Sequence, residues 1–198
     1  MLAPQFLRSK FEAALPYADY VASGTPDQQA MWKATHSRVS LSASQRTLVA
    51  SFNRRVNVLV SSGLWCGDCA HQCPMLAKIE EAHPAKAGSD ASPGIRLRFL
   101  NRDAHLDLAD QVKICGGHRV PTVIFFSEDF EFVSLLGDKT LSRLRAKAAK
   151  ALGASCPLPG AELPADELAS TLQEWIDEHE RVHLTLRLST RLRTLHGD

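Results

Sequence analysis

The sequence predicts an α/β fold built around a mixed sheet. The short apolar run 56–60, rich in β-branched residues, indicates a buried central strand. A second strand is expected at 95–100, and a helical pattern separates the two. This strand–helix–strand order predicts a right-handed crossover and parallel pairing. Two further apolar runs, 122–126 and 130–133, are joined by the short polar link 127–129, which predicts an antiparallel hairpin. The expected sheet therefore contains both parallel and antiparallel pairs.

Helices are expected before and after these strands. Residues 1–52 have apolar residues at helical spacing, with a stop and a new start at 24–27, and predict an N-terminal helical extension. The sheet domain is expected at 53–181, with a helical and loop insertion at about 139–161. A last helix is expected to begin at Pro164, because proline suits a first helical turn. Its buried face is predicted to comprise Leu168, Leu172, Trp175 and Ile176.

Two shorter segments complete the pattern. A short helix is expected to contain Leu108, Val112 and Ile114 and to end at Gly116-Gly117. The tail at 182–198 fits two structures: its alternating leucines are typical of a strand, and its leucines four residues apart are typical of a helix. Both alternatives for the tail stay open.

The composition is that of an ordinary globular chain. Of its residues 44% are hydrophobic and 23% are charged, and the formal net charge is +1, so neither nucleic-acid binding nor general disorder is expected. The start of the sequence has no apolar run typical of a signal peptide, and no stretch approaches a membrane span, which favours a cytoplasmic location. The oligomeric state stays open. A solvated basic face is expected from Arg181, Arg187, Arg191 and Arg193.

Cys66 and Cys69 are the residues that carry chemistry. The chain has five cysteines, and a cytoplasmic location keeps cysteines reduced, so a disulfide here is expected to be a catalytic intermediate. Because the pair follows the strand at 56–60, we expect it at the first turn of a helix, where unpaired N–H groups and the helix dipole stabilise a thiolate on Cys66. A thiolate attacks a disulfide, so Cys66 is the predicted nucleophile and Cys69 the resolving thiol.

Metal binding is the alternative for the same segment, because His71 and Cys73 follow closely. Helical geometry argues against it: at about 100° per residue, His71 points roughly 140° away from Cys66. The sequence also lacks a second Cys or His pair that would complete a tetrahedral set. The redox interpretation is therefore favoured, and no metal site is predicted.

Two motifs together resemble the thioredoxin superfamily. The segment Trp65-Cys66-Gly67-Asp68-Cys69 lies between a strand and a helix, and Val120-Pro121-Thr122 opens the predicted hairpin. The resemblance covers about 53–137 and 162–180. It implies a thioredoxin-like three-layer α/β/α sandwich, here with extra N-terminal helices.

The resemblance also implies an activity and its partners. The chain is expected to reduce protein disulfides by exchange at Cys66 and Cys69, with the redox-active disulfide between them and no other cofactor, and with an electron donor of the thioredoxin-reductase type. In the family the proline of the second motif is cis and faces the dithiol, and the residue before it offers backbone hydrogen bonds to the substrate; these roles fall on Pro121 and Val120. The residues expected to contact substrate are Trp65, Gly67, Asp68, Val120, Pro121 and Thr122.

The sequence also departs from the family pattern. Asp68 stands where proline is usual, and its charge is expected to oppose a thiolate at Cys66. Val60 and Phe99 stand where the family has a buried aspartate and its lysine partner. Proton transfer for Cys69 is then expected to use water or a nearby group such as Ser61 or Ser62. These departures predict a chain that reacts differently from a general-purpose thioredoxin.

A non-catalytic binding or adaptor module is the second hypothesis, because the N-terminal helices and the tail lie outside the catalytic resemblance and a fold does not fix a function. Among the other candidates, Cys73 is expected to be a buried packing residue, with a third redox thiol as the alternative. Cys115, Cys156, His118 and Arg119 are expected in loops, where Cys115, His118 and Arg119 could approach the substrate.

Overall fold

A four-stranded mixed sheet forms the centre of the molecule. The computed structural model describes residues 2–84, 94–152 and 165–197. The strands lie in the order β2-β1-β3-β4; β1 pairs with β2 in parallel, and the other neighbours are antiparallel. The predicted mixed sheet and α/β class are therefore confirmed. The strand bounds are β1 Arg55–Ser62, β2 Gly94–Asn101, β3 Thr122–Ser127 and β4 Phe132–Gly137.

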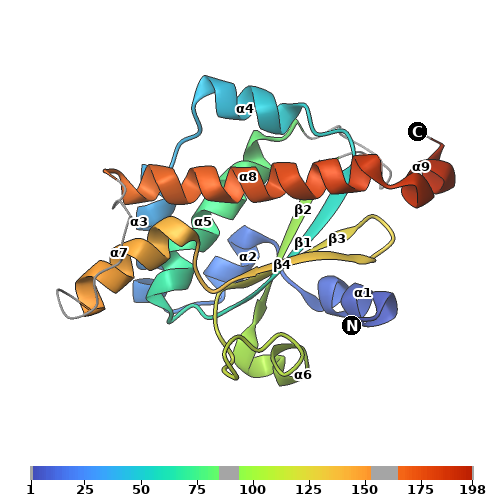
Figure 1. Cartoon of the computed structure of the whole chain (residues 1–198). Coiled ribbons are helices and arrows are strands. Elements are labelled where there is room, and N and C mark those ends of the chain that lie inside the picture. The colour runs from blue at the N-terminus through green and yellow to red at the C-terminus, as the bar shows by residue number, and fades with distance from the viewer. Residues whose placement is uncertain (1, 85–93, 153–164, 198) are drawn as a thin grey trace.

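Helices cover both faces of this sheet, as Figure 1 shows. One face carries a core that includes residues of α2, α3, α4, α5 and α8. A second core on the other face involves α1 and α6. The helix bounds are α1 Pro4–Ala13, α2 Tyr17–Ala22, α3 Pro26–Arg38, α4 Ala43–Ala50, α5 Gly67–Ala82, the 3-10 turn η1 Arg102–Ala104, α6 Leu106–Ala109, α7 Leu141–Leu152, α8 Glu167–Leu188 and α9 Thr190–His196. No helix within the described ranges has the length and apolarity needed to cross a membrane.

The N-terminal segment is helical, as predicted. Thr25 and Ser42 each begin a helix with a capping box, in which the hydroxyl accepts from the third residue and that residue's side chain accepts from the cap. Trp32 of α3 is fully buried and belongs to the same core as the sheet residues. These helices therefore pack against the sheet and share its core.

The predicted second arm of the hairpin begins two residues too early. Phe130 has φ +65°, in the left-handed region that a strand does not use, and the Ser127 hydroxyl accepts from the backbone N–H groups of Asp129 and Glu131. This turn delays β4 until Phe132.

The predicted short helix is also shorter than expected. Helix α6 ends at Ala109, and Ile114 lies beyond it, in a turn where its backbone N–H and C=O both bond to Gly117. Cys115 and Gly116 take positive φ values of +50° and +73° to close that turn, which ends any helical hydrogen bonding.

The open alternative for the tail is resolved as helix. Helix α8 continues to Leu188 and α9 follows, with Val182, Leu186 and Leu192 buried, whereas Leu184 and Leu188 are exposed. The tail is therefore helical, but its buried face is not the row of leucines four residues apart that starts at Leu184. The expected start at Pro164 and most of the loop from 153 lie outside the described residues, and α8 begins with Asp166 as its N-cap.

Candidate active site

The dithiol lies where β1 ends and α5 begins. Cys66 is the N-cap residue of α5, with extended backbone angles, and its sulfur accepts a hydrogen bond from the backbone N–H of Cys69 at 3.4 Å. Cys66 is half-buried, Cys69 is fully buried, and both are free thiols. The first sulfur is thus accessible to a substrate, and the second lies behind it in the core.

The loop before β3 brings a second motif to the same place. The Val120–Pro121 peptide bond is cis, as expected from the resemblance, and the Cys66 thiol donates to the Val120 carbonyl at 3.7 Å. Thr122 is fully buried and its hydroxyl donates to the Arg119 carbonyl, so its side chain supports the loop. Backbone groups at Val120 are therefore the part of this motif that faces the dithiol.

Both thiols are held in their protonated form. The interaction between the two thiol side chains and partial burial raise the pKa of the Cys66 thiol, and these effects exceed the opposing bonds from the backbone N–H groups of Cys69 and Asp68. Burial raises the pKa of the Cys69 thiol well above its ordinary value. In the reduced protein, Cys66 must therefore lose its proton before its sulfur can attack a disulfide.

Asp68 is not an unmatched negative charge beside Cys66. Its carboxylate lies 2.8 Å from the Lys147 ammonium, 3.1 Å from the Arg143 guanidinium and 3.4 Å from the Lys139 ammonium. Partial burial opposes ionisation, but the bond from Lys147 and the charges of Lys139 and Arg143 hold the pKa of Asp68 below its usual range. The expected repulsion between Asp68 and a thiolate is therefore offset by cations of α7 and the loop before it.

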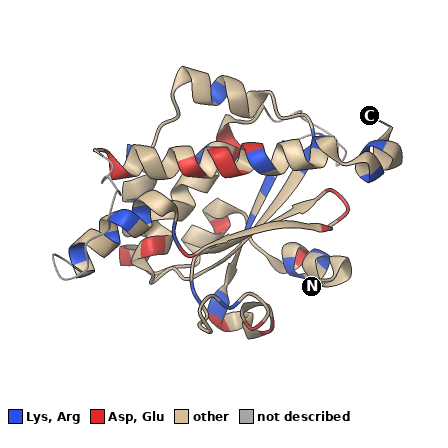
Figure 2. Cartoon of the chain, viewed as in Figure 1, with Lys and Arg blue, Asp and Glu red and all other residues tan. Residues whose placement is uncertain are grey.

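The sequence analysis missed these cations, although the basic character of α7 was visible in it. Figure 2 shows Lys and Arg along this helix. What the sequence did not show is that the helix brings Arg143 and Lys147 to Asp68 in the first turn of α5. Gln72, one turn farther along α5, holds the loop before α7 by accepting from the Thr140 N–H and donating to the Asp138 carbonyl.

Comparison with known proteins identifies the fold. A model of the thioredoxin family matches residues 14–140. The chain belongs to the thioredoxin family. A protein of unknown function from Pseudomonas aeruginosa has a similar structure, with a TM-score of 0.66, 17% identity, and coverage of 92% of this chain and 97% of that one. An HIV epitope-scaffold is also similar, with a TM-score of 0.58, 16% identity, and coverage of 87% and 97%. The comparison with curated proteins gave no match.

The interior behind this thioredoxin-family dithiol is aromatic. Val60 and Phe99 are fully buried and are register partners across β1 and β2. Phe99 stacks on Tyr20 at 5.5 Å between ring centroids, and Trp32 lies edge-on to it at 6.2 Å. The resemblance places a buried aspartate–lysine pair in this part of the family's core. Here aromatic rings occupy it: Phe99 of β2, Tyr20 of α2 and Trp32 of α3.

Trp65 offers a flat surface beside the dithiol. Its side chain is 52% exposed, the Arg102 guanidinium lies 5.0 Å from its ring centroid, and its indole N–H donates to Asp103 at 3.3 Å. The cation over the ring and the bond at its edge hold the indole in one orientation. Gly67 leaves open space next to it, since an added Cβ would meet nothing within 4 Å.

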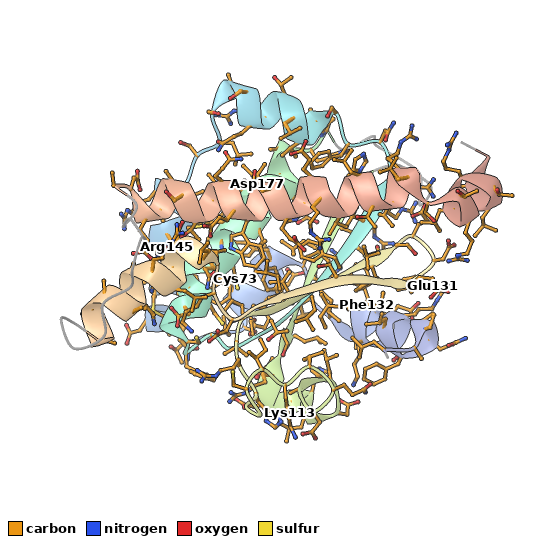
Figure 3. All side chains as sticks on the ribbon, viewed as in Figure 1. Cys73, Lys113, Glu131, Phe132, Arg145 and Asp177 are labelled. Atoms are coloured by element: carbon orange, nitrogen blue, oxygen red, sulfur yellow. The ribbon has the colours of Figure 1, made fainter. Side chains whose placement is uncertain are left out.

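The remaining candidates take lesser places. Cys73 is fully buried on α5, in the interior of the molecule (Figure 3). Cys115 is exposed, and Cys156 lies outside the described residues. His118 pairs with Asp110 at 2.9 Å, and Arg119 lies 3.8 Å from Asp138. His71 faces Glu167, and no group of three His, Cys, Asp or Glu side chains suited to a metal occurs in the ranges described.

Replacing Asp68 by asparagine is expected to make Cys66 more acidic. The change removes one negative charge and leaves Lys147 without its carboxylate partner, whereas Lys139 keeps Asp138 and Arg143 keeps Glu167. The local charge becomes more positive, which favours the thiolate. Alkylation of Cys66 by iodoacetamide at pH 7 and low salt should be about 3- to 10-fold faster in Asp68→Asn, and added salt should reduce the difference. A rate equal to that of the wild type would contradict this electrostatic balance.

Proposed function

We propose that this chain is a thiol–disulfide oxidoreductase that reduces protein disulfides at Cys66 and Cys69. One observation carries the proposal: an accessible thiol at a helix N-terminus has the buried second thiol behind it and the carbonyl before the cis proline in front of it. A disulfide that approaches Cys66 meets this carbonyl and the Trp65 ring, which can orient a peptide by backbone hydrogen bonding and by stacking. Membership of the thioredoxin family supports the same chemistry.

The reaction proceeds by two exchanges. The Cys66 thiolate attacks one sulfur of the substrate disulfide; a bond forms between Cys66 and that sulfur, and the other substrate sulfur leaves as a thiolate and is protonated. Cys69 then loses its proton and attacks Cys66, which breaks the mixed disulfide and releases the second substrate thiolate, to be protonated in turn. The substrate gains two electrons and two protons, and the chain is left with a Cys66–Cys69 disulfide.

The proposal includes the partners of this cycle. Reduction of the Cys66–Cys69 disulfide requires an external dithiol or an electron donor of the thioredoxin-reductase type. No cofactor other than the disulfide itself enters the two exchanges. A cytoplasmic location belongs to the same proposal, because a reducing compartment keeps the dithiol reduced between turnovers.

Insulin reduction in the presence of dithiothreitol tests the function. Cys66→Ser should abolish catalysis, because the attacking sulfur is lost, whereas Cys115→Ser should retain the wild-type rate, because that cysteine is exposed in a turn outside the dithiol. In Cys69→Ser the mixed disulfide cannot be resolved, so substrates should remain bound to Cys66 and be released by reductant. Undiminished activity of Cys66→Ser, or a wild type no faster than dithiothreitol alone, would refute the proposal.

The rate of the first exchange should increase with pH. Because the interaction with the Cys69 thiol and burial raise the pKa of Cys66, the reactive thiolate is the minor form at neutral pH. Its fraction rises about tenfold per pH unit until the pKa is reached. Iodoacetamide alkylation of the reduced protein, followed from pH 6 to 9, should therefore show no plateau near neutrality. A plateau below pH 7 would show that the helix N-terminus dominates.

A further inference from the structure

Helix α7, which lies beside the dithiol, carries positive charge and no negative charge. Its residues include no aspartate or glutamate but four cations: Arg143, Arg145, Lys147 and Lys150. Two of these, Arg143 and Lys147, pair with Asp68 at 3.1 Å and 2.8 Å, and Asp68 lies between Cys66 and Cys69 in the sequence. These ion pairs join the basic helix directly to the active-site turn, as the charged residues in Figure 2 illustrate.

Bonds to α8 fix which side of α7 faces the active site. Glu174 of α8 accepts from the Ser142 N–H at 3.0 Å and from the Ser142 hydroxyl at 2.7 Å. Residues three or four positions apart share a helix face, so Arg143, Lys147 and Lys150 form one cationic row. The row begins at Asp68 and continues past Lys147 by about 5 Å, close to one turn of the helix.

The charges of this row are only partly neutralised by the chain itself. Arg143 is shared between Asp68 and Glu167, and its side chain is only 18% exposed. The Lys147 side chain is 46% exposed even though it pairs with Asp68. Lys150 is exposed and has no acidic partner within residues 2–84, 94–152 and 165–197. The outer end of the row therefore presents positive charge to a partner.

Exposed leucines border the cationic row. Leu144 lies three positions before Lys147 and is 48% exposed, and Leu141 lies one turn earlier and is 54% exposed. A helix surface with cations along one side and leucines along the other fits a peptide that has carboxylates and some apolar side chains.

A further exposed cation lies next to the Val120 carbonyl. Arg119 has a side chain that is 53% exposed and lies 3.8 Å from Asp138, which also pairs with Lys139. Lys139 in turn lies 3.4 Å from Asp68. Ion pairs therefore connect the loop before the cis proline to α7, and both ends of this network carry an exposed cation.

We propose that α7 binds an acidic segment of the protein whose disulfide Cys66 attacks, with Lys147 and Lys150 paired to its carboxylates and Leu144 against its apolar side chains. This inference rests on the proposed function and names its substrate class, which is protein disulfides flanked by aspartate or glutamate. Pairing with α7 holds the disulfide near Cys66 and accelerates the first exchange. The bonds that form and break in that exchange stay the same.

Two synthetic peptides test this preference. Each has one cysteine joined to thionitrobenzoate by a disulfide, beside a run of aspartates in the first peptide and of asparagines in the second. Attack by the Cys66 thiolate on the peptide sulfur forms the mixed disulfide and releases one thionitrobenzoate, whose absorbance gives the rate. The parent protein should carry Cys115→Ser and Cys156→Ser, so that thiols outside α5 do not contribute. At low salt the acidic peptide should react about tenfold faster, because each of two exposed pairs contributes about threefold, and added salt should reduce the preference.

Lys150→Glu reverses the charge at the outer end of the row. The ratio of the acidic to the neutral rate should fall from about ten to about one, since an attraction is replaced by a repulsion. This ratio cancels any change in the thiolate fraction of Cys66, because both peptides meet the same thiol. Arg191→Glu is the matched control and should keep the preference: its side chain is 59% exposed, and it lies in α9, beyond the end of α8 and about 20 Å along that helix from Glu174 (Figure 1).

The outcomes distinguish this inference from the function on which it rests. Equal rates with both peptides in the parent, or a preference that persists in a folded Lys150→Glu, would overturn binding by α7 and leave the function standing. An equal loss of preference in Arg191→Glu would show a response to net charge alone and would also overturn it. Failure of the parent to release thionitrobenzoate from either peptide would refute the reactivity of Cys66 and with it the proposed function. Thermal unfolding of each variant reports on folding.

Discussion

Trp32→Ala is expected to lower the free energy of unfolding by about 3–5 kcal/mol, which approaches the whole stability of many single domains. Trp32 is fully buried, contacts the rings of Tyr17, Tyr20 and Phe99, and donates its indole N–H to the Leu64 carbonyl at 3.1 Å. The substitution leaves a cavity in the core and also frees the turn that leads into Cys66. Urea unfolding followed by circular dichroism measures the loss.

Trp32→Phe isolates the hydrogen bond from the packing. A phenyl ring keeps much of the buried area but leaves the Leu64 carbonyl without its donor, which costs about 1–3 kcal/mol in addition to the smaller cavity. Trp175→Phe is the matched control, because Trp175 is equally buried and its indole N–H has no partner in the described residues. If the two variants lost the same stability and the same disulfide-reductase activity, the bond to Leu64 would have no role.

The sequence predicted those parts of the fold that local patterns determine. The apolar runs of β1 and β3 indicated buried strands because both faces of a central strand are covered, and the position of Cys66 at a helix start followed from the strand before it. The apolar run that begins at Phe130 predicts a strand from that residue onward, and the structure places Phe130 in the turn. Only the bonds to the Ser127 hydroxyl show why the chain turns there.

The sequence predicted the places of the motif residues and not what surrounds them. Cys66, Cys69 and the cis Pro121 lie as the motifs implied. The side chains around them make contacts that are distant in the sequence: the Tyr20 hydroxyl bonds to Ser62 across 42 positions, and Lys147 bonds to Asp68 across 79. No periodicity or spacing reports such contacts, because they depend on how complete helices pack.

The N-terminal helices bear on the choice between enzyme and adaptor. The adaptor hypothesis rests on helices that lie outside the catalytic resemblance, yet α2 and α3 pack directly behind the dithiol and fix the turn before it. Their position makes them part of the structure that holds the dithiol. Partner binding by the same helices would have to use their outer faces, where Met31 of α3 is exposed.

Gly137→Ala is expected to reduce disulfide-reductase activity by at least about tenfold, through a clash beside the cis proline. Gly137 ends β4 opposite Thr122, and an added Cβ would lie 2.8 Å from the Pro121 carbonyl oxygen and 3.0 Å from the Thr122 Cα. Both are backbone atoms and cannot rotate away, so we expect the Pro121 segment to shift and to move the Val120 carbonyl away from Cys66. Gly117→Ala is the matched control, since its Cβ would meet ordinary contacts at 3.7 Å and 3.8 Å. Insulin reduction with thermal unfolding measures both variants, and wild-type activity in Gly137→Ala would show that β4 shifts without displacing the loop.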